Sequence, residues 1–231
     1  CCGTTPGHIK EIARALKPMQ KITAARPAVP VKTGPAAPAD ELQQVPLKDR
    51  SLIGRKLASG EKFVSIEISP PKETDTAALL ERVKLCKEHG IDAVNIPDGP
   101  RATSRLSALI TAIIIKQKLD METILHVCCR DKNLISIQSD LLGAESIGIH
   151  NLLLITGDPP KVGDFPDASG VFDLDSIQLT SLVRGLNHGL DVAGKGLKSP
   201  MSFTAGVGAN PAASNFELEI ERFRRKVKAG A

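Results

Sequence analysis

The sequence has no tryptophan, no tyrosine and only six phenylalanines in 231 residues. Proteins that bind single-stranded nucleic acid stack bases on aromatic side chains, so this scarcity argues against such a partner. Charge gives the same indication, because 30 Lys and Arg residues are offset by 26 Asp and Glu residues. The net charge of +4 is spread along the chain and forms no basic tract. We therefore expect no nucleic acid among the partners.

Long hydrophobic runs are also missing. The longest wholly apolar stretch, at residues 112–115, is far shorter than the ~20 residues of a membrane-spanning helix. No charged and then apolar leader begins the chain. The five cysteines include two adjacent pairs, which is unlike a secreted disulfide framework. These absences predict a cytoplasmic protein without a membrane partner, whose cysteines are reduced or bind metal.

A proline-rich segment, residues 17–50, marks a domain boundary. Its prolines stand among Ala, Val, Thr and Lys, a composition that favours an extended, solvated linker. Residues 1–16 precede it and are too few to fold alone, so we expect them to be the tail of a domain whose larger part is absent. Residues 51–231 are then the second, folded domain.

Five short apolar runs with β propensity follow the linker, and each precedes a segment of helical length. The runs are FVSIEI, DAVNI, TILHVCC, NLLLITG and MSFTAGV. Apolar residues at helical spacing predict the buried faces of four of the helices. These faces are Leu79, Val83 and Cys86; Leu106, Leu109, Ile110 and Ile113; Leu134, Ile137 and Leu141; and Phe216, Ile220, Phe223 and Val227.

Successive βα units predict an α/β fold with parallel strands, either an open doubly wound sheet or a (β/α)8 barrel. No G-x-G-x-x-G motif follows the first strand, and informative residues end several different strands, which favours the TIM barrel. A full barrel needs about 250 residues. Residues 51–231 supply about five βα units, so we expect an incomplete barrel and a chain truncated at both ends.

Catalytic residues of such barrels lie where the strands end. Glu67 ends the first strand, and a carboxylate between apolar walls favours its protonated form, which suits a proton donor near pH 7. A buried glutamate satisfied by Lys or Arg is the structural alternative.

The next two strands offer further polar residues. Asn95 and Asp98 end the second strand, although Asp98 also suits a turn. His126 in the third strand suits a metal, a substrate or a hydrogen bond in the core, the last being favoured for a lone histidine. Cys128 and Cys129 face apart on a strand, which argues against a zinc site shared with the other adjacent pair.

The fourth strand ends in Thr156, Gly157 and Asp158, and a long loop rich in Gly, Pro and Asp follows. Loops of this length in a compact barrel are usually functional. Gly157 allows a ligand to approach the backbone, and Asp158 places a charge at the barrel mouth. In the fifth strand Gly206 and Gly208 leave room for a flat ligand.

Several segments together resemble the methylenetetrahydrofolate reductases across essentially all of residues 51–231. They are IEISPPK, NIPDGPRATSRLS, HVCCRDKNLISIQSDLLGA, LLLITGDPPKVGDFPDASGVFDLDSI and ERFRRKVKAGA. The resemblance implies a barrel that binds FAD, accepts hydride from NAD(P)H and reduces 5,10-methylenetetrahydrofolate to 5-methyltetrahydrofolate. It implies that Glu67 protonates the folate and that Asp158 lies between flavin and pterin. The implied flavin contacts are Asn95, Asp98, His126, Thr156, Gly157, Asp158, Phe172 and Asp173, with Arg225 and Lys226 at the phosphates.

The opening segment, CCGTTPGHI, resembles the end of a homocysteine S-methyltransferase barrel, which would be a second TIM barrel. It implies that Cys1 and Cys2 are two of three thiolate ligands to a Zn²⁺ ion that activates homocysteine. The whole chain thus resembles bifunctional bacterial enzymes in which the two activities are fused. Folate and homocysteine are the implied partners, and a homo-oligomer is compatible with this resemblance.

Two other functions stay open for the barrel: a pterin-binding methyltransferase without flavin, and a non-catalytic regulatory barrel. An acid at Glu67 favours the reductase, since a regulatory barrel has no use for it.

Overall fold

The structure, a computed structural model, describes residues 44–231 together with Gly7, Lys10, Glu11 and Arg14. The chain divides into two units, Cys1–Pro30 and Val31–Ala231. In the first unit the described residues are helical, and Nη1 of Arg14 donates a hydrogen bond to Glu11 over 3.1 Å. Cys1, Cys2 and most of the predicted linker lie outside the described residues, so the zinc ligands stay a prediction.

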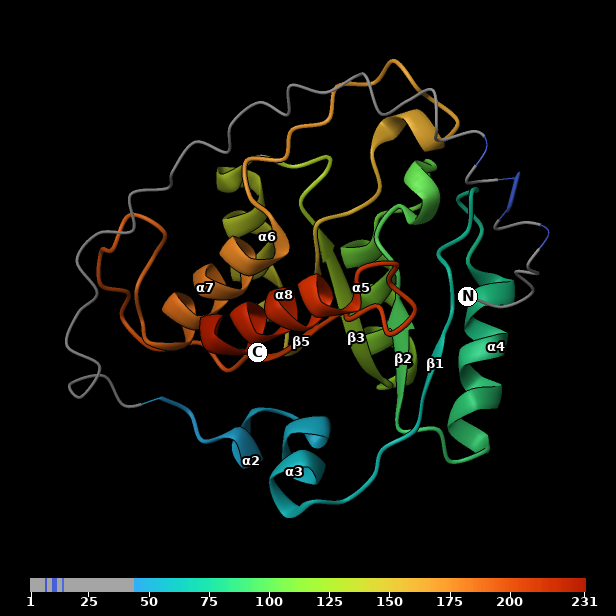
Figure 1. The fold of residues 1–231 in the computed structure, drawn as a ribbon. Coiled ribbons are helices and arrows are strands. Elements are labelled where there is room, and N and C mark those ends of the chain that lie inside the picture. The colour runs from blue at the N-terminus through green and yellow to red at the C-terminus, as the bar shows by residue number, and fades with distance from the viewer. Residues whose placement is uncertain (1–6, 8–9, 12–13, 15–43) are drawn as a thin grey trace. The chain divides into compact units, whose positions relative to one another are not determined.

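The second unit is built around a parallel sheet of five strands (Figure 1). The strands are β1 (Ser65–Glu67), β2 (Ala93–Ile96), β3 (Glu122–Cys128), β4 (Asn151–Ile155) and β5 (Thr204–Val207). Their order in the sheet follows the chain, β1-β2-β3-β4-β5. A doubly wound sheet would reverse its order at a switch point. The five predicted strands are confirmed, and their order is consistent with part of a barrel.

A helix follows every strand (Figure 1). These helices are α4 (Ala77–Glu88), α5 (Ala108–Leu119), α6 (Leu134–Ser146), α7 (Ser176–Asn187) and α8 (Phe216–Ala229). Short 3-10 turns, η2 (Pro100–Ala102) and η3 (Pro160–Val162), lie in the loops after β2 and β4. Polar side chains cap most helix starts, and Asp175 and Gln178 form a capping box at α7. In this part of the chain no helix combines the length and the apolar character needed to span a bilayer.

The core lies between the sheet and these helices. Strand residues on one face of the sheet are buried under helix residues, which removes apolar surface from water and stabilises the unit. The largest contributors from the strands are Ile96, Leu152 and Leu154, and those from α4 and α6 are Leu79, Val83, Ile137 and Leu141. The predicted faces of α4 and α6 are therefore confirmed.

The predicted face of α5 is confirmed only in part: Leu109 and Ile113 are half-buried and pack against the core. Ala108, Thr111, Ala112 and Ile115 are the buried residues, and the side chain of Ile110 is 46% exposed. The helix is apolar on several sides, so spacing alone did not single out the face that packs on the sheet.

The predicted face of α8 is wrong. Phe216, Phe223 and Val227 are exposed, whereas Lys226 and Ala229 are buried. The inward side of α8 is held by polar bonds, because the ammonium of Lys226 donates to the carbonyl oxygen of Gly208 over 2.5 Å. The hydrophobic pattern alone therefore did not identify the side of α8 that is buried.

Two short helices, α2 (Leu47–Arg50) and α3 (Leu52–Ser59), lie near the amino ends of the strands. The hydroxyl of Ser51 caps α3 by accepting from the amide of Gly54 and donates to Asn151 at the start of β4. The guanidinium of Arg50 donates to the carbonyl of Phe203 over 2.9 Å. Residues 47–50 therefore pack with the folded unit, although composition placed them at the end of the linker.

Candidate active site

Three predicted site residues form a polar row on neighbouring strands. Glu67 and Asn95 are register partners of β1 and β2. The amide of Asn95 donates to the hydroxyl of Ser65 over 2.8 Å, and its carbonyl oxygen lies 3.3 Å from Nε2 of His126 on β3. Because side chains alternate along a strand, this row belongs to the face opposite the helix-covered core. The sheet thus places Glu67, Asn95 and His126 on three neighbouring strands.

His126 is buried, with 7% of its surface exposed. Burial lowers the pKa of the imidazole to about 4, because the protonated ring loses its hydration without gaining a carboxylate partner. The ring is therefore neutral at physiological pH. A neutral ring that donates from Nε2 to Asn95 offers Nδ1 as an acceptor.

Glu67 does not have the environment that its sequence predicts. Its side chain is exposed, and β1 is an edge strand in the described part of the sheet. This exposure does not agree with the apolar walls that the sequence predicted around the carboxyl group.

Asp98, at the end of β2, is held from two sides. Its carboxylate accepts from the amide of Cys128 over 3.3 Å and lies 3.5 Å from the ammonium of Lys132. Lys132 also contacts Asp140 on α6 at 2.8 Å. Burial raises the pKa of Asp98, and the attraction of Lys132 opposes that rise. Asp98 thus ties β2 to β3, a structural role beside the predicted contact with flavin.

Both cysteines of β3 are neutral thiols. Burial raises the pKa of Cys128 and raises that of Cys129 to about 12. A thiolate is the form that binds metal, so these groups are poorly suited to it. The described residues contain no group of three potential metal ligands.

The end of β4 is tightly packed. The hydroxyl of Thr156 accepts from the amide of Ser176 over 3.0 Å and so joins β4 to the start of α7. Gly157 has φ +93°, and a Cβ at this position would overlap Sγ of Cys128. The glycine is therefore required by its own chain. Asp158, which follows, has an exposed side chain.

Two predicted contacts lie at the far end of the loop after β4. Phe172 is half-buried with φ +46°, an uncommon conformation for a residue with a side chain. The carboxylate of Asp173 accepts from the amide of Leu134 over 3.2 Å, at the start of α6. A negative charge at that position stabilises the helix terminus, which gives Asp173 a structural role too.

The predicted phosphate contacts differ from each other. Lys226 is buried and its ammonium reaches the carbonyl of Gly208 just beyond β5, whereas Arg225 is exposed. Only Lys226 is therefore held at the carboxyl end of the sheet by a bond within the chain.

Arg130 and Lys132 are the residues of this region that the sequence interpretation did not select. Arg130 is 3% exposed and donates to Asp131, Gly99 and Asp158. The charged run Arg-Asp-Lys directly after a buried strand was the available signal, since such residues are rarely buried without a partner.

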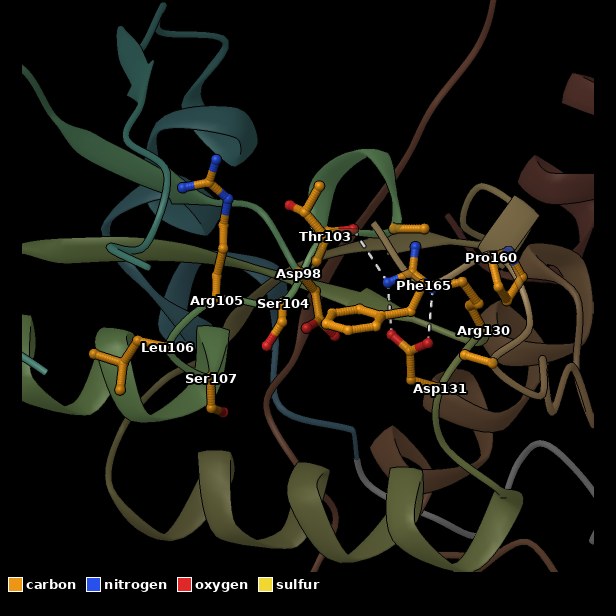
Figure 2. Close-up of a pocket in the computed structure, with 13 residues that line it drawn as sticks. Asp98, Thr103, Ser104, Arg105, Leu106, Ser107, Arg130, Asp131, Pro160 and Phe165 are labelled. Carbon is orange, nitrogen blue, oxygen red and sulfur yellow. Dashed lines mark hydrogen bonds and ion pairs between the residues drawn. The ribbon is translucent and has the colours of Figure 1, made fainter. Parts of the chain in front are cut away.

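A pocket of about 290 Å³ lies between the loops after β2 and β4 (Figure 2). Its walls include Asp98, Ser104, the Arg130–Asp131 pair and the ring of Phe165. Arg105 also lines it, and Nε of that side chain is buried without a hydrogen-bond partner. Asp98 is the one predicted site residue that lines this pocket, which therefore does not coincide with the polar row.

The family model described as methylenetetrahydrofolate reductase matches residues 52–231. The chain belongs to the methylenetetrahydrofolate reductase family. A probable methylenetetrahydrofolate reductase (NADH) from Oryza sativa subsp. japonica is 30% identical over 178 residues, which cover 75% of this chain and 30% of the rice protein. Methylenetetrahydrofolate reductase (NADH) 1 from Zea mays is 30% identical over 176 residues, covering 74% of this chain and 29% of that protein.

The chain thus spans less than a third of the length of these curated relatives. It has the family's sequence features over residues 52–231 and a parallel α/β sheet.

Proposed function

We propose that the protein reduces 5,10-methylenetetrahydrofolate to 5-methyltetrahydrofolate, with FAD as cofactor and NAD(P)H as electron donor. The observation that carries this proposal is the row of Glu67, Asn95 and His126, which offers an acid, an amide and a neutral imidazole side by side. The relatives named above are NADH enzymes, which favours NADH as the donor.

The face of the sheet that carries Asn95 and His126 would hold the flat ring system of the cofactor. A Cβ at Gly206 would meet its nearest neighbours, the carbonyl of Leu152 and Cδ1 of Leu153, at 3.5 and 3.7 Å, which are ordinary contacts. Packing within the chain therefore does not require glycine at position 206, and the absence of a side chain there leaves space on this face. Asn95, His126 and Thr156 would hold the ring system, with Lys226 nearest to the phosphates. When bound, FAD supplies hydride transfer between nicotinamide and folate.

Glu67 would supply the proton that the folate requires. The methylene carbon is held between two nitrogens in a five-membered ring, and hydride reaches it only after one C–N bond breaks. A proton from the carboxyl group goes to the departing nitrogen, and the carbon becomes an iminium cation that accepts the hydride.

His126 and Asn95 would orient the ligand without exchanging protons. The imidazole is neutral across physiological pH because burial lowers its pKa to about 4. Its bond to Asn95 fixes the ring, so each group presents one defined polar atom to a bound ligand.

Glu67→Gln in the full-length protein tests the proposal. Reduction of the flavin by NADH should stay within a few-fold, because it needs no proton from the protein. Reoxidation by methylenetetrahydrofolate should slow by at least about a hundredfold, the usual effect of losing a general acid. The oxidised flavin absorbs at about 450 nm, so stopped-flow absorbance at this wavelength follows both steps.

Glu73→Gln is the matched control, since Glu73 is an exposed glutamate in the loop after the same strand. Both of its rates should stay within about twofold. Equal losses in the two steps of Glu67→Gln would assign Glu67 to flavin binding or to the fold. A protein without flavin absorbance would instead favour the pterin-binding methyltransferase or the regulatory barrel.

A second activity, zinc-dependent transfer of a methyl group to homocysteine, is proposed for the full-length protein. The motif CCGTTPGHI supports it, with Cys1 and Cys2 as thiolate ligands. These residues lie outside the described part of the structure, so the proposal rests on the sequence.

A further inference from the structure

One side chain, Arg130, contacts three of the loops that leave the carboxyl ends of the strands. Figure 2 shows its contact with Asp131. Its guanidinium donates to the carboxylate of Asp131 over 2.7 and 2.6 Å, to the carbonyl of Gly99 over 3.1 Å and to that of Asp158 over 3.3 Å. Gly99 follows β2, Asp131 follows β3 and Asp158 follows β4. A planar guanidinium with five donors in fixed directions is suited to joining several acceptors in this way.

The backbone of Arg130 makes a fourth connection. Its carbonyl oxygen accepts from the amide of Val171 over 2.7 Å. Asp158 and Val171 lie near the two ends of the loop after β4. A single residue therefore holds both ends of this loop, which includes the exposed side chains of Val162 and Phe165.

We propose that Arg130 is a positioning residue that fixes both ends of the loop from Asp158 to Val171, and with it the place of Asp158 in the reductase site. The part concerning Asp158 rests on the proposed function, and the part concerning the loop does not. In the described residues, no hydrogen bond holds the carboxylate of Asp158 itself. Its position therefore depends on its backbone, where Arg130 is bound.

The other hydrogen bond that joins this loop to another part of the described chain is weaker. Lys72 and Asp164 form an ion pair at 3.3 Å, but their side chains are 55% and 51% exposed. Exposed pairs of this kind contribute little, because solvent screens them. The Arg130 side chain is 4% exposed, so water does not replace the bonds that it makes. We therefore expect its loss to act on the loop first.

Hydrogen exchange on the full-length protein tests this proposal. Arg130→Gln keeps a polar side chain but does not reach all three loops, so exchange of the amides from residue 161 to residue 171 should accelerate at least about tenfold. Exchange in β3 and β4 should change by less than about twofold. Acceleration of equal size in these strands would show a general loss of stability and overturn the proposal, as would unchanged exchange in the loop.

Kinetics test the part that concerns Asp158. In Arg130→Gln the kcat for folate reduction should fall at least about tenfold, because small displacements of a site residue are costly. The KM for NADH and the rate of flavin reduction should change by less than about threefold. Equal losses in both half-reactions would overturn this part. If the unmodified protein does not reduce methylenetetrahydrofolate, the proposed function fails, and the exchange experiment still decides the role of the loop contacts.

Two further variants complete the design. Arg130→Lys keeps the buried charge beside Asp131 without the planar fork, so its loop exchange should lie between those of the unmodified protein and Arg130→Gln. If Arg130→Gln does not fold, Arg130→Lys replaces it in the test. Loop exchange in Arg130→Lys equal to that of the unmodified protein would then overturn the proposal. Arg82→Gln is the control, because Arg82 is exposed on α4 and bonds only within its own helix in the described structure. It should alter neither exchange nor kinetics.

Discussion

Replacing Gly157 with alanine tests how tightly the end of β4 is packed. Gly157 has φ +93°, and an added Cβ would overlap Sγ of Cys128 and lie 3.2 Å from Cβ of Arg130. The left-handed conformation costs a residue with a side chain roughly 1–2 kcal/mol, and overpacking costs roughly 1–3 kcal/mol. Gly157→Ala should therefore lower the free energy of unfolding by about 2–5 kcal/mol.

The two contributions are separable. Cys128→Ala removes the sulfur atom that the new methyl group would overlap, but it leaves φ unchanged. In that background Gly157→Ala should cost about 1–3 kcal/mol less, so that mainly the backbone contribution remains. Gly143→Ala in α6 is the control, because no atom lies within 4 Å of its Cβ position and alanine is favoured in a helix. It should stabilise the protein by about 0.5–1 kcal/mol.

Urea unfolding followed by far-ultraviolet circular dichroism measures these differences. Intrinsic fluorescence is a poor probe here, since the chain has no tryptophan and no tyrosine. A change below about 0.5 kcal/mol for Gly157→Ala would refute the packing argument. An unchanged cost in the Cys128→Ala background would show that the sulfur atom is not the obstacle.

Two predictions concern protonation and metal. The pKa of His126 is about 4 in the folded state, because burial lowers it, against about 6.5 in the unfolded chain. The unfolded state therefore binds the proton first as pH falls, and roughly 3 kcal/mol of stability, complete above about pH 6.5, should be lost between about pH 6.5 and 4. His126→Gln should remove this part of the pH dependence in urea titrations, and an unchanged slope would contradict it. The full-length protein should contain about one zinc ion by mass spectrometry. Cys1→Ser and Cys2→Ser should each lower that content, whereas Cys86→Ser on α4 should not, and full zinc retention in the first two would exclude them as ligands.

Local sequence patterns predicted the elements of this unit because a strand and a helix are encoded by the residues that form them. Short β-branched runs between turn residues predicted all five strands, and apolar spacing predicted the buried faces of α4 and α6. The same patterns succeeded only in part for α5 and failed for α8. In α5 several sides were apolar, and in α8 the buried residues, Lys226 and Ala229, lie outside the stripe of large apolar residues.

For the candidate site, too, the sequence predicted one part and the structure supplied the other. Glu67, Asn95 and His126 were found in the sequence because they are polar residues in strand segments that are otherwise apolar. Their contacts with one another could not be found in the sequence, because the hydrogen bond between Asn95 and His126 joins residues 31 positions apart. The exposure of Glu67 depends on its position at the edge of the described sheet, which its own segment does not encode.

What the sequence determined by itself was the succession of strands and helices, the family and the residue types available for chemistry. The tertiary structure alone decided which of those residues meet. Arg130 is the clearest case, because its contacts with Gly99 and Asp158 span 31 and 28 positions of sequence. A parallel sheet brings the carboxyl ends of consecutive strands to one edge, although a whole helix separates them along the chain. Contacts between such loops therefore exist only once the sheet has formed.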